Sequence, residues 1–597
     1  MKFFAFLLSL ALFLIYTSLF ITPALALYDP QTEPNNRFGI HIIQAGPAEA
    51  VPARELVNSS GGDWGYITFL IESKDRNETK WRDFFNELRR KHLIPIVRLA
   101  TEPEGDFWKK PYEGEEVAWA DFLDKLPWPT KNRYIIIYNE PNHATEWGNS
   151  VDPADYAKTL DKTIEALKSK NPDFFVINAG LDASAPEKQP DYMDSENFMK
   201  AMNEAVPGIF NKLDGWSSHS YPNPAFSGSP DASGKGTIRT WHREDQILKD
   251  LGVNKNLPIF ITETGWKHAE GKTTNNSLLS VEKVAEYYKD AFNKAWNNNR
   301  IVAVTPFLLD YKEPPFDHFA FIKATFQGDQ SSEEKFHPQY FALRDLPKIK
   351  GEPLQENKAK FVKGSISKDN LLSSFDEASA SSALRTSLVA GETYDISLSV
   401  KNIGQSIWND MKKIRIIPSE NGARFGIQSQ DLPEDVKVEP DQSYTFNYKI
   451  TAPEGGEYKI FLNLLADDFL FQSPPLEVDF EVKSPVILKV EGGLKWKNNP
   501  AGQYLLSIYG QIKDAFNGTT DTIELNIDGE SKEIEARYLL PDKPYSFTLE
   551  KPFYKPKTIT QTVSSGINEI EFGDLQPDIS SAILNPSQLW KLLPWSE

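Results

Sequence analysis

The 597-residue sequence contains no cysteine, which excludes disulfide bridges, cysteine-ligated zinc sites and cysteine nucleophiles. Export is still compatible with this absence, because extracytoplasmic proteins often use disulfides but do not require them. Histidine is scarce as well: the eight residues show neither an H-E-x-x-H nor an H-x-H spacing, and no phosphate-cradling glycine-rich loop is present. We therefore expect no metal and no other cofactor.

Basic runs are also missing, and the net charge is -19 with a pI of about 5.1. An acidic surface repels phosphate backbones, so we expect no nucleic-acid partner. No basic segment of the kind that binds anionic lipid is present. The sequence does not indicate the oligomeric state.

A long apolar run occurs only at the N-terminus, where Lys2 precedes residues 3–21 and the pattern Ala24-Leu25-Ala26 follows. A charged start, a hydrophobic core and an A-x-A site are typical of a signal peptide. We predict that residues 1–26 are cleaved and that the mature protein is secreted or located at the cell surface. The alternative is an uncleaved anchor, and this segment would then be the protein's only contact with a membrane.

Residues 37–350 alternate short apolar runs with helical patterns. Most runs lack a period-two alternation, as expected for parallel strands that are buried on both faces. Eight strand–helix units predict a (β/α)8 barrel, also called a TIM barrel, and a doubly wound open sheet is the structural alternative. The eight runs are residues 38–43, 66–71, 94–99, 134–138, 174–179, 213–221, 259–262 and 301–309.

Beyond the barrel, the pattern changes to short strands separated by turns, as in residues 393–400 and 456–464. This pattern predicts a multidomain chain in which two β-sandwich domains follow the barrel and act as spacers. Binding of carbohydrate or of a cell surface is the alternative role for them. The predicted segments are a linker over 351–372, an immunoglobulin-like β-sandwich over 373–484, a second β-rich domain over 485–574 and a tail over 575–597.

Two glutamates follow predicted strands of the barrel. Asn139-Glu140 comes after residues 134–138, and Glu263 comes after residues 259–262, which are strands 4 and 7 in chain order. Barrel enzymes place their active sites at this end of the strands. A lone glutamate there is usually a solvated or capping residue. A pair on opposite walls can instead approach to about 5–5.5 Å, the separation found in retaining glycosidases.

Asn139-Glu140 after strand 4 and Glu263 after strand 7 resemble clan A of the glycoside hydrolases, the retaining (α/β)8 enzymes. The resemblance covers roughly residues 37–346. It implies that Glu140 is the acid/base and that Glu263 is the nucleophile of a covalent glycosyl-enzyme. It also implies that Asn139 hydrogen-bonds the 2-hydroxyl group of the sugar.

His219-Ser220-Tyr221 resembles the H-x-Y pattern of the same clan. The resemblance implies that His219 lines the sugar site and that the Tyr221 hydroxyl holds the carboxylate of Glu263. Arg98, at the end of strand 3, is expected beneath the nucleophile. The alternatives are a hydrogen-bonded core histidine for His219 and a salt bridge in the barrel rim for Arg98.

Aromatic side chains stack on the apolar faces of pyranose rings. Trp147 and Trp266, like Trp108, follow strand ends and are therefore predicted sugar platforms, with ordinary loop packing as the alternative. Many clan A members also have a tryptophan at the end of strand 8. This sequence has none there, and Phe307 is the candidate replacement, which argues against a close match to the cellulase-like families.

The sequence thus predicts a retaining glycosidase that hydrolyses O-glycosidic bonds of a β-linked oligosaccharide or polysaccharide. One alternative is a non-catalytic carbohydrate-binding or cell-surface protein built on the same barrel. Another is a barrel hydrolase or lyase that uses paired carboxylates on a non-sugar substrate. Neither the sugar nor the choice between internal and terminal cleavage can be predicted from these residues.

Overall fold

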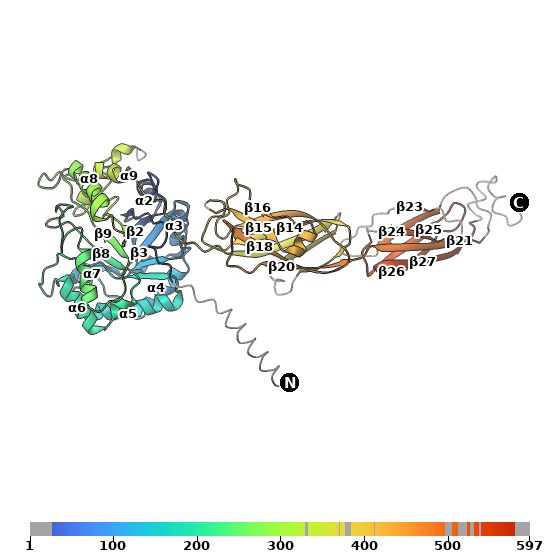
Figure 1. Cartoon of the computed structure of the whole chain (residues 1–597), viewed down its shortest axis with the longest axis horizontal. Coiled ribbons are helices and arrows are strands. Elements are labelled where there is room, and N and C mark those ends of the chain that lie inside the picture. The colour runs from blue at the N-terminus through green and yellow to red at the C-terminus, as the bar shows by residue number, and fades with distance from the viewer. Residues whose placement is uncertain are drawn as a thin grey trace, which may run out of the picture. The chain divides into compact units, whose positions relative to one another are not determined.

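The chain forms two compact units, Met1–Glu356 and Asn357–Glu597. The computed structural model (Figure 1) describes residues 27–328, 332–368, 371–376, 384–410, 412–495, 504–510, 522–525, 531–536 and 539–578. The predicted signal peptide and residues 579–597 of the predicted tail lie outside these ranges. Among the described residues, no helix combines the length and the apolar character needed to span a bilayer.

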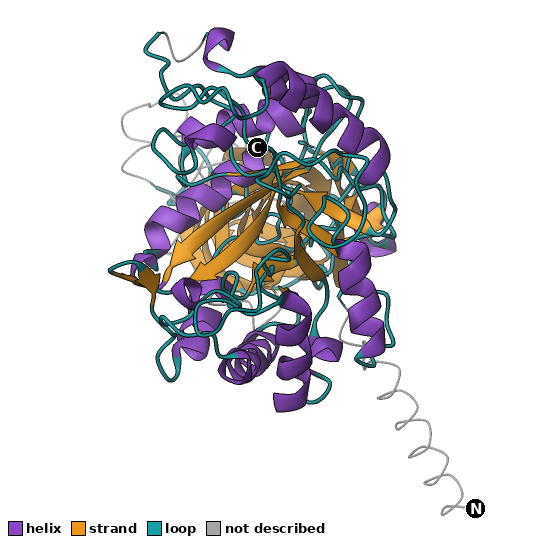
Figure 2. Ribbon diagram, turned by 90° about the vertical axis from the view of Figure 1, so that its left-hand side faces the viewer, coloured by secondary structure: helices purple, strands orange, loops and turns teal. Residues whose placement is uncertain are grey.

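The first unit is a closed barrel of parallel strands (Figure 2). Parallel pairing joins the strands in the orders β1-β2-β3-β6-β7 and β10-β9-β8. Two isolated parallel bridges, Phe38 with Val304 and Ile177 with Gly215, join these two sheets into one ring. A closed ring has no open edge, so the doubly wound alternative is wrong.

Each barrel strand is followed by a helix, and the helices surround the strands (Figure 2). Hairpin β4 (Pro103–Glu104) and β5 (Phe107–Trp108) and the short helix η2 (Ala144–Glu146) lie in loops after barrel strands. The barrel strands are β1 (Gly39–His41), β2 (Gly65–Glu72), β3 (Leu93–Ala100), β6 (Arg133–Ile136), β7 (Phe174–Ile177), β8 (Trp216–His219), β9 (Ile259–Glu263) and β10 (Ile301–Val304). The helices that follow them are α2 (Pro47–Val57), α3 (Glu78–Arg90), α4 (Glu115–Asp124), α5 (Pro153–Lys170), α6 (Ser195–Ala205), α7 (Trp241–Asp250), α8 (Val281–Asp290) and α9 (Pro338–Arg344).

Local sequence explains these elements. The strands are apolar on both faces, and Ile67, Val97 and Ile135 are fully buried, because side chains fill the barrel and helices cover it. Helix α5 begins where the Asp152 carboxylate accepts the backbone N–H of Asp155 at 3.0 Å. Side-chain caps of this kind also begin α3, α6 and α8 and so mark the ends of the loops before them.

The linker predicted over residues 351–372 is too long: residues 351–358 lie outside helices and strands, but a strand begins at Ala359. Strand β11 (Ala359–Lys368) pairs with β12 (Leu371–Asp376) and β14 (Thr393–Asn402) across most of that stretch. Lys360 and Lys363 are exposed while Ile366 is buried, so the polar composition of the stretch belongs to the solvent face of an amphipathic strand.

The second unit contains a first β-sandwich whose two sheets share one core. One sheet has the order β12-β11-β14-β17, and the other has the order β13-β20-β18-β15-β16 with β19 beside β18. Leu398 and Phe446 of the first sheet belong to the same hydrophobic cluster as Ile460 and Phe480 of the second. The remaining elements are β13 (Leu384–Val389), β15 (Ile414–Pro418), α10 (Glu420–Arg424), β16 (Gln430–Asp431), β17 (Ser443–Thr451), β18 (Gly456–Ala466), β19 (Phe469–Leu470) and β20 (Leu476–Lys483).

A further pair of sheets follows, with the orders β24-β21-β27 and β23-β22-β25-β26. These sheets have a separate core, in which Leu488 and Phe572 of one sheet join Leu506 and Phe547 of the other. The strands are β21 (Val486–Leu494), β22 (Tyr504–Gly510), β23 (Thr522–Leu525), β24 (Lys532–Ala536), β25 (Lys543–Glu550), β26 (Lys557–Val563) and β27 (Gly566–Leu575).

Candidate active site

Glu140 and Glu263 lie at the carboxyl ends of the fourth and seventh barrel strands. Glu263 is the last residue of β9, and Glu140 lies in the loop that follows β6. The backbone of Glu140 has a φ of 30°, in the left-handed region that residues other than glycine rarely adopt. Its N–H donates to the Gly180 carbonyl at 3.1 Å, and its own carbonyl accepts the His143 N–H at 2.9 Å. These two bonds hold Glu140 in its strained conformation.

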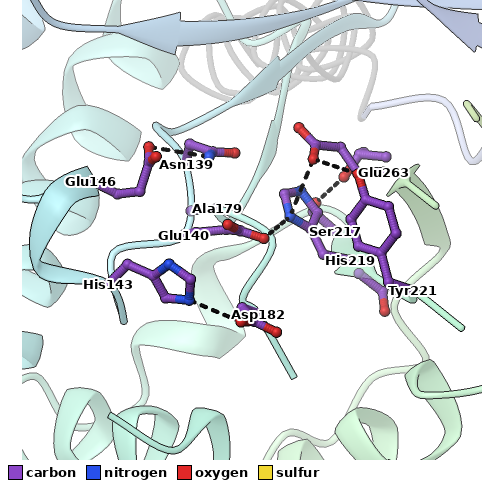
Figure 3. Close-up of polar contacts among 12 residues, drawn as sticks. Asn139, Glu140, His143, Glu146, Ala179, Asp182, Ser217, His219, Tyr221 and Glu263 are labelled. Atoms are coloured by element: carbon purple, nitrogen blue, oxygen red, sulfur yellow. Dashed lines mark hydrogen bonds and ion pairs between the residues drawn. The ribbon is translucent and has the colours of Figure 1, made fainter. Parts of the chain in front are cut away.

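His219 lies between the two glutamates (Figure 3). Its Nδ1 atom is 2.7 Å from Oε1 of Glu140 and 3.8 Å from Oε2 of Glu263. One oxygen of each carboxylate and one ring nitrogen of His219 all lie within 4.8 Å of one another. The barrel therefore brings the two predicted carboxylates and the predicted histidine together in one cluster.

Glu263 is surrounded by positive charge and hydrogen-bond donors. Arg98 Nη1 donates to its Oε1 at 2.6 Å, and the Tyr221 hydroxyl donates to its Oε2 at 3.1 Å. Burial alone raises the pKa of Glu263, but the charges of His219 and Arg98 outweigh burial and hold the pKa below its ordinary value. The Glu263 carboxylate is thus ionised at neutral pH.

The pKa of His219, and so its charge, depends on the same two glutamates. Burial lowers the pKa of His219, but the negative charge of Glu263 and the hydrogen bond to Glu140 outweigh burial and leave the pKa above its ordinary value. His41 behaves differently, because complete burial lowers its pKa to about 3 although its Nε2 lies 3.8 Å from Glu263. His41 is therefore a neutral neighbour of the nucleophile candidate.

Asn139 is hydrogen-bonded on both ends of its amide. Its Oδ1 accepts from Arg98 Nη1 at 2.8 Å, and its Nδ2 donates to Oε2 of Glu146 at 3.2 Å (Figure 3). Burial and the charge of Glu140 raise the pKa of Glu146 to about 7. Sequence reasoning missed Glu146, because it follows no strand and only the turn η2 brings it back toward Asn139.

A second polar pair that sequence reasoning missed faces the Glu140 side. His143 Nε2 lies 2.9 Å from a carboxylate oxygen of Asp182 (Figure 3). Burial lowers the pKa of His143, but the Asp182 bond and the charge of Glu140 outweigh burial and raise it above the ordinary value. Both residues come from strand-to-helix loops, and their pairing depends on loop geometry for which the sequence has no motif.

Two of the three predicted tryptophan platforms, Trp147 and Trp266, are wrong, whereas Trp108 in β5 is only partly buried. Trp147 and Trp266 are each 1% exposed, so neither presents a ring face to a sugar. Trp147 Nε1 donates to Asp155, and Trp266 Nε1 donates to the Gly228 carbonyl. Both rings fill space beneath the loops, a role that strand-end position alone does not reveal. Phe307 is also buried, at 8% exposed.

Glu140, Glu263 and His219 have the spacing of a metal-ligand group. An ion at that point would lie beside the permanent charge of Arg98, whose guanidinium is already bonded to Glu263. Arg98 therefore already supplies the positive charge beside Glu263, so the site suits a carboxylate held by an arginine better than it suits a divalent cation.

No family model and no curated protein matches the sequence. Among solved structures, an endo-β-1,3-glucanase of GH128 subgroup II from Sorangium cellulosum is 14% identical, with 52% of this chain and 97% of that chain covered and a TM-score of 0.35. A β-mannanase from Thermomonospora fusca is 12% identical, with 48% and 82% covered and a TM-score of 0.30. A glycoside hydrolase family 30 subfamily 8 xylanase from Clostridium acetobutylicum is 11% identical, with 70% and 98% covered and a TM-score of 0.31.

These similar structures are glycoside hydrolases at low identity, and they single out no specific family for this chain. Likeness at such TM-scores does not identify an activity. The functional assignment therefore depends on the geometry of the site itself.

Proposed function

We propose that this protein is a retaining glycoside hydrolase that cleaves a β-linked oligosaccharide or polysaccharide through a covalent glycosyl-enzyme. The supporting observation is the short separation of Glu140 and Glu263, whose nearer oxygens lie within 4.8 Å. Retaining glycosidases hold their carboxyl groups about 5–5.5 Å apart, whereas inverting enzymes need about 6.5–9.5 Å to admit a water molecule. A separation this short favours the retaining arrangement over the inverting one.

The surroundings of each carboxylate suit different roles in this reaction. Glu263, kept ionised by Arg98, attacks the anomeric carbon as the leaving oxygen departs. Glu140 protonates that leaving oxygen and later takes a proton from the water that releases the sugar. His219, bonded to Glu140, fixes the direction of the acid/base.

Tyr221 and Asn139 complete the proposed machinery. The Tyr221 hydroxyl stabilises the negative charge of Glu263 before attack. Asn139 has a second N–H on Nδ2 besides the one bonded to Glu146, and this hydrogen is available for the 2-hydroxyl of the sugar. Such a contact strengthens in the transition state of retaining enzymes.

The same proposal places the enzyme outside the cytoplasmic membrane, either secreted or at the cell surface. Its support is the apolar N-terminal segment with the Ala24-Leu25-Ala26 site. We further infer that the β-sandwich after the barrel is immunoglobulin-like and serves with the following β domain as a spacer.

The test is a panel of activated aryl β-glycosides and their 2-fluoro analogues. A 2-fluoro analogue of the sugar that is cleaved should inactivate the enzyme at one molecule per chain, and peptide mass spectrometry should find the label on Glu263. The Glu263→Gln variant, of matched size, should take up no label. A label on another residue, or an inverted product anomer seen by NMR, would refute the mechanism. Sugar binding without turnover across the panel would instead support a non-catalytic protein.

A further inference from the structure

The amide of Asn139 has a fixed orientation because its two ends face chemically different partners. Arg98 can only donate hydrogen bonds, so the amide oxygen must be the atom that faces it, at 2.8 Å. The amide nitrogen then faces Glu146, which accepts at 3.2 Å. A hydrogen-bonded path thus runs from Glu263 through Arg98 and Asn139 to Glu146, and Figure 3 shows its last step, from Asn139 to Glu146.

Hydrogen bonds hold the backbone at Glu146, whose N–H donates to the His143 carbonyl at 3.1 Å. Behind it, Trp147 is buried and Gly148 N–H donates to the Trp108 carbonyl of hairpin β4–β5 at 2.8 Å. Within the described residues, Glu146 forms no salt bridge.

The charged groups around Glu146 come from several elements. Glu140 and Glu263 raise its pKa, and Arg98 of β3 lowers it. His143 lies on the same loop, and on the hairpin side Lys110 is bound to Asp155. Burial is the largest influence and Glu140 the next, and together they raise the pKa of Glu146 to about 7.

We propose that Glu146 is a positioning residue that aims Asn139 at the 2-hydroxyl of the substrate. The proposal rests on the proposed glycosidase function. The Glu146 carboxylate accepts one N–H of the amide, and the other N–H is thereby directed toward the sugar. A hydrogen bond to a carboxylate is roughly twice as strong as one to a neutral acceptor, so protonation of Glu146 loosens Asn139. Activity that depends on the 2-hydroxyl is thereby coupled to pH near neutrality.

The positioning itself is tested by crystal structures of two variants of the full chain. Glu146→Gln retains an oxygen that accepts from Asn139, so the amide should keep its orientation. Glu146→Ala removes the acceptor, and Asn139 should rotate or occupy two rotamers. An unchanged Asn139 in Glu146→Ala overturns the proposal. This result does not depend on turnover and stands apart from the proposed function.

The functional consequence is tested with aryl glycosides that either possess or lack the 2-hydroxyl. Glu146→Ala should lower kcat/KM about tenfold on the 2-hydroxy substrate and by less than about twofold on the 2-deoxy substrate. In an Asn139→Ala background, Glu146→Ala should have little further effect, because the two residues act through one contact. Equal losses on both substrates would show that Glu146 only supports the loop and would overturn the proposal.

The pH profile provides a matched comparison. In the parent, kcat/KM on the 2-hydroxy substrate should fall as pH drops below about 7, because Glu146 takes up a proton there. Glu146→Gln cannot take up a proton there and should not show this fall in kcat/KM.

The control variant is Glu104→Gln, which removes an exposed acid from hairpin β4–β5 and should retain the pH profile of the parent. If kcat/KM of Glu146→Gln still falls below about pH 7, another group causes the fall, and the proposed link between Glu146 and pH is overturned. If the parent cleaves neither substrate, the glycosidase function fails, and the crystal structures alone decide the positioning.

Discussion

At the scale of single residues, the site depends on the placement of His219 between two carboxylates. His219 is 3% exposed, and its imidazole packs directly against the backbone of Gly180. A Cβ atom at Gly180 would lie 2.0 Å from Cδ2 of His219, far inside van der Waals contact. The carbonyl of the same glycine accepts the N–H of Glu140. Gly180 therefore affects the position of Glu140 both through its carbonyl and through its missing side chain.

We expect Gly180→Ala to lower kcat/KM at least tenfold on an activated aryl glycoside. The added methyl group must push the imidazole away and so break its 2.7 Å contact with Glu140. Overpacking of this kind typically costs about 1–3 kcal/mol, so Tm should also fall. Steady-state kinetics and thermal unfolding measure the two effects.

A matched control is Gly46→Ala, because no atom lies within 4 Å of a Cβ at Gly46 and its backbone is extended. This variant should retain the activity of the parent. Full activity in Gly180→Ala would mean that the His219 contact with Glu140 is dispensable.

How far the site could be predicted depends on which kind of segment a residue occupies. Arg98 lies near the end of β3, and Asn139 and Tyr221 follow β6 and β8. The ends of parallel strands must converge at one rim of a closed barrel, and there Arg98 and Tyr221 contact Glu263 while Asn139 contacts Arg98. Glu146 and Asp182 lie within loops, and no periodic pattern in the sequence predicts the conformation of a loop. The burial of Trp147 and Trp266 depends on how the loops pack over the rim, which is a tertiary property.

At the scale of elements, a histidine cluster joins the loop after β9 to the start of α9. The rings of His268 and His337 lie 4.4 Å apart. His268 Nε2 donates to the Ala320 carbonyl at 2.9 Å, so its Nδ1 holds the lone pair of the neutral ring. Burial is the main cause that lowers the pKa of His268 to about 4 and that of His337 to about 3. Helix α9 is thus anchored through neutral imidazoles.

Stability should therefore decline as pH falls below about 6.5. In the unfolded chain both histidines take up protons near pH 6.5, while in the folded chain they resist protonation until about pH 4 and 3. Between these limits the unfolded state binds more protons, so the free energy of unfolding rises with pH, by up to about 1.4 kcal/mol per pH unit for each histidine. Above pH 6.5 this contribution is constant.

The measurement is Tm between pH 7.5 and 5, where most carboxylates stay ionised. His268→Gln keeps a donor for the Ala320 carbonyl but cannot take up a proton, so its Tm should fall less steeply than that of the parent. The difference in Tm between parent and variant at pH 7.5 measures the loss of stability that the substitution causes apart from protonation. If Tm falls equally steeply with pH in the parent and in His268→Gln, His268 is not a neutral buried residue.

Most barrel elements could be predicted from sequence, because buried parallel strands produce uninterrupted apolar runs of few residues. Strand β11 could not, since its exposed lysines at 360 and 363 resemble linker composition. The hairpin β4–β5 was missed for another reason: two-residue strands such as Phe107–Trp108 are too short to show any period. Pattern reasoning works where an element is long and buried, and fails at short or half-exposed elements.

At the scale of the whole molecule, the chain passes from hydrogen bonds with the barrel to hydrogen bonds with the second unit within three residues, from Gln355 to Asn357. Gln355 Nε2 donates to the Pro129 carbonyl of the barrel at 2.8 Å, and Leu354 accepts from Lys131 N–H. Asn357 instead accepts from Gln472 N–H in the second unit. Each unit buries its own hydrophobic clusters, and every residue of the proposed site belongs to the first unit.

A chain that ends at Glu356 should therefore fold and keep its chemistry. We expect residues 27–356 to cleave a soluble aryl glycoside with kcat/KM within about twofold of the full chain, because the bonds around Glu140 and Glu263 all come from the barrel. Calorimetry of the full chain should contain the unfolding transition of the shorter one at a similar Tm. A shorter chain that unfolds at the same Tm but loses activity more than tenfold would contradict this expectation. Comparing Tm with kcat/KM on one small substrate separates a loss of activity through misfolding from a loss of activity in a folded barrel.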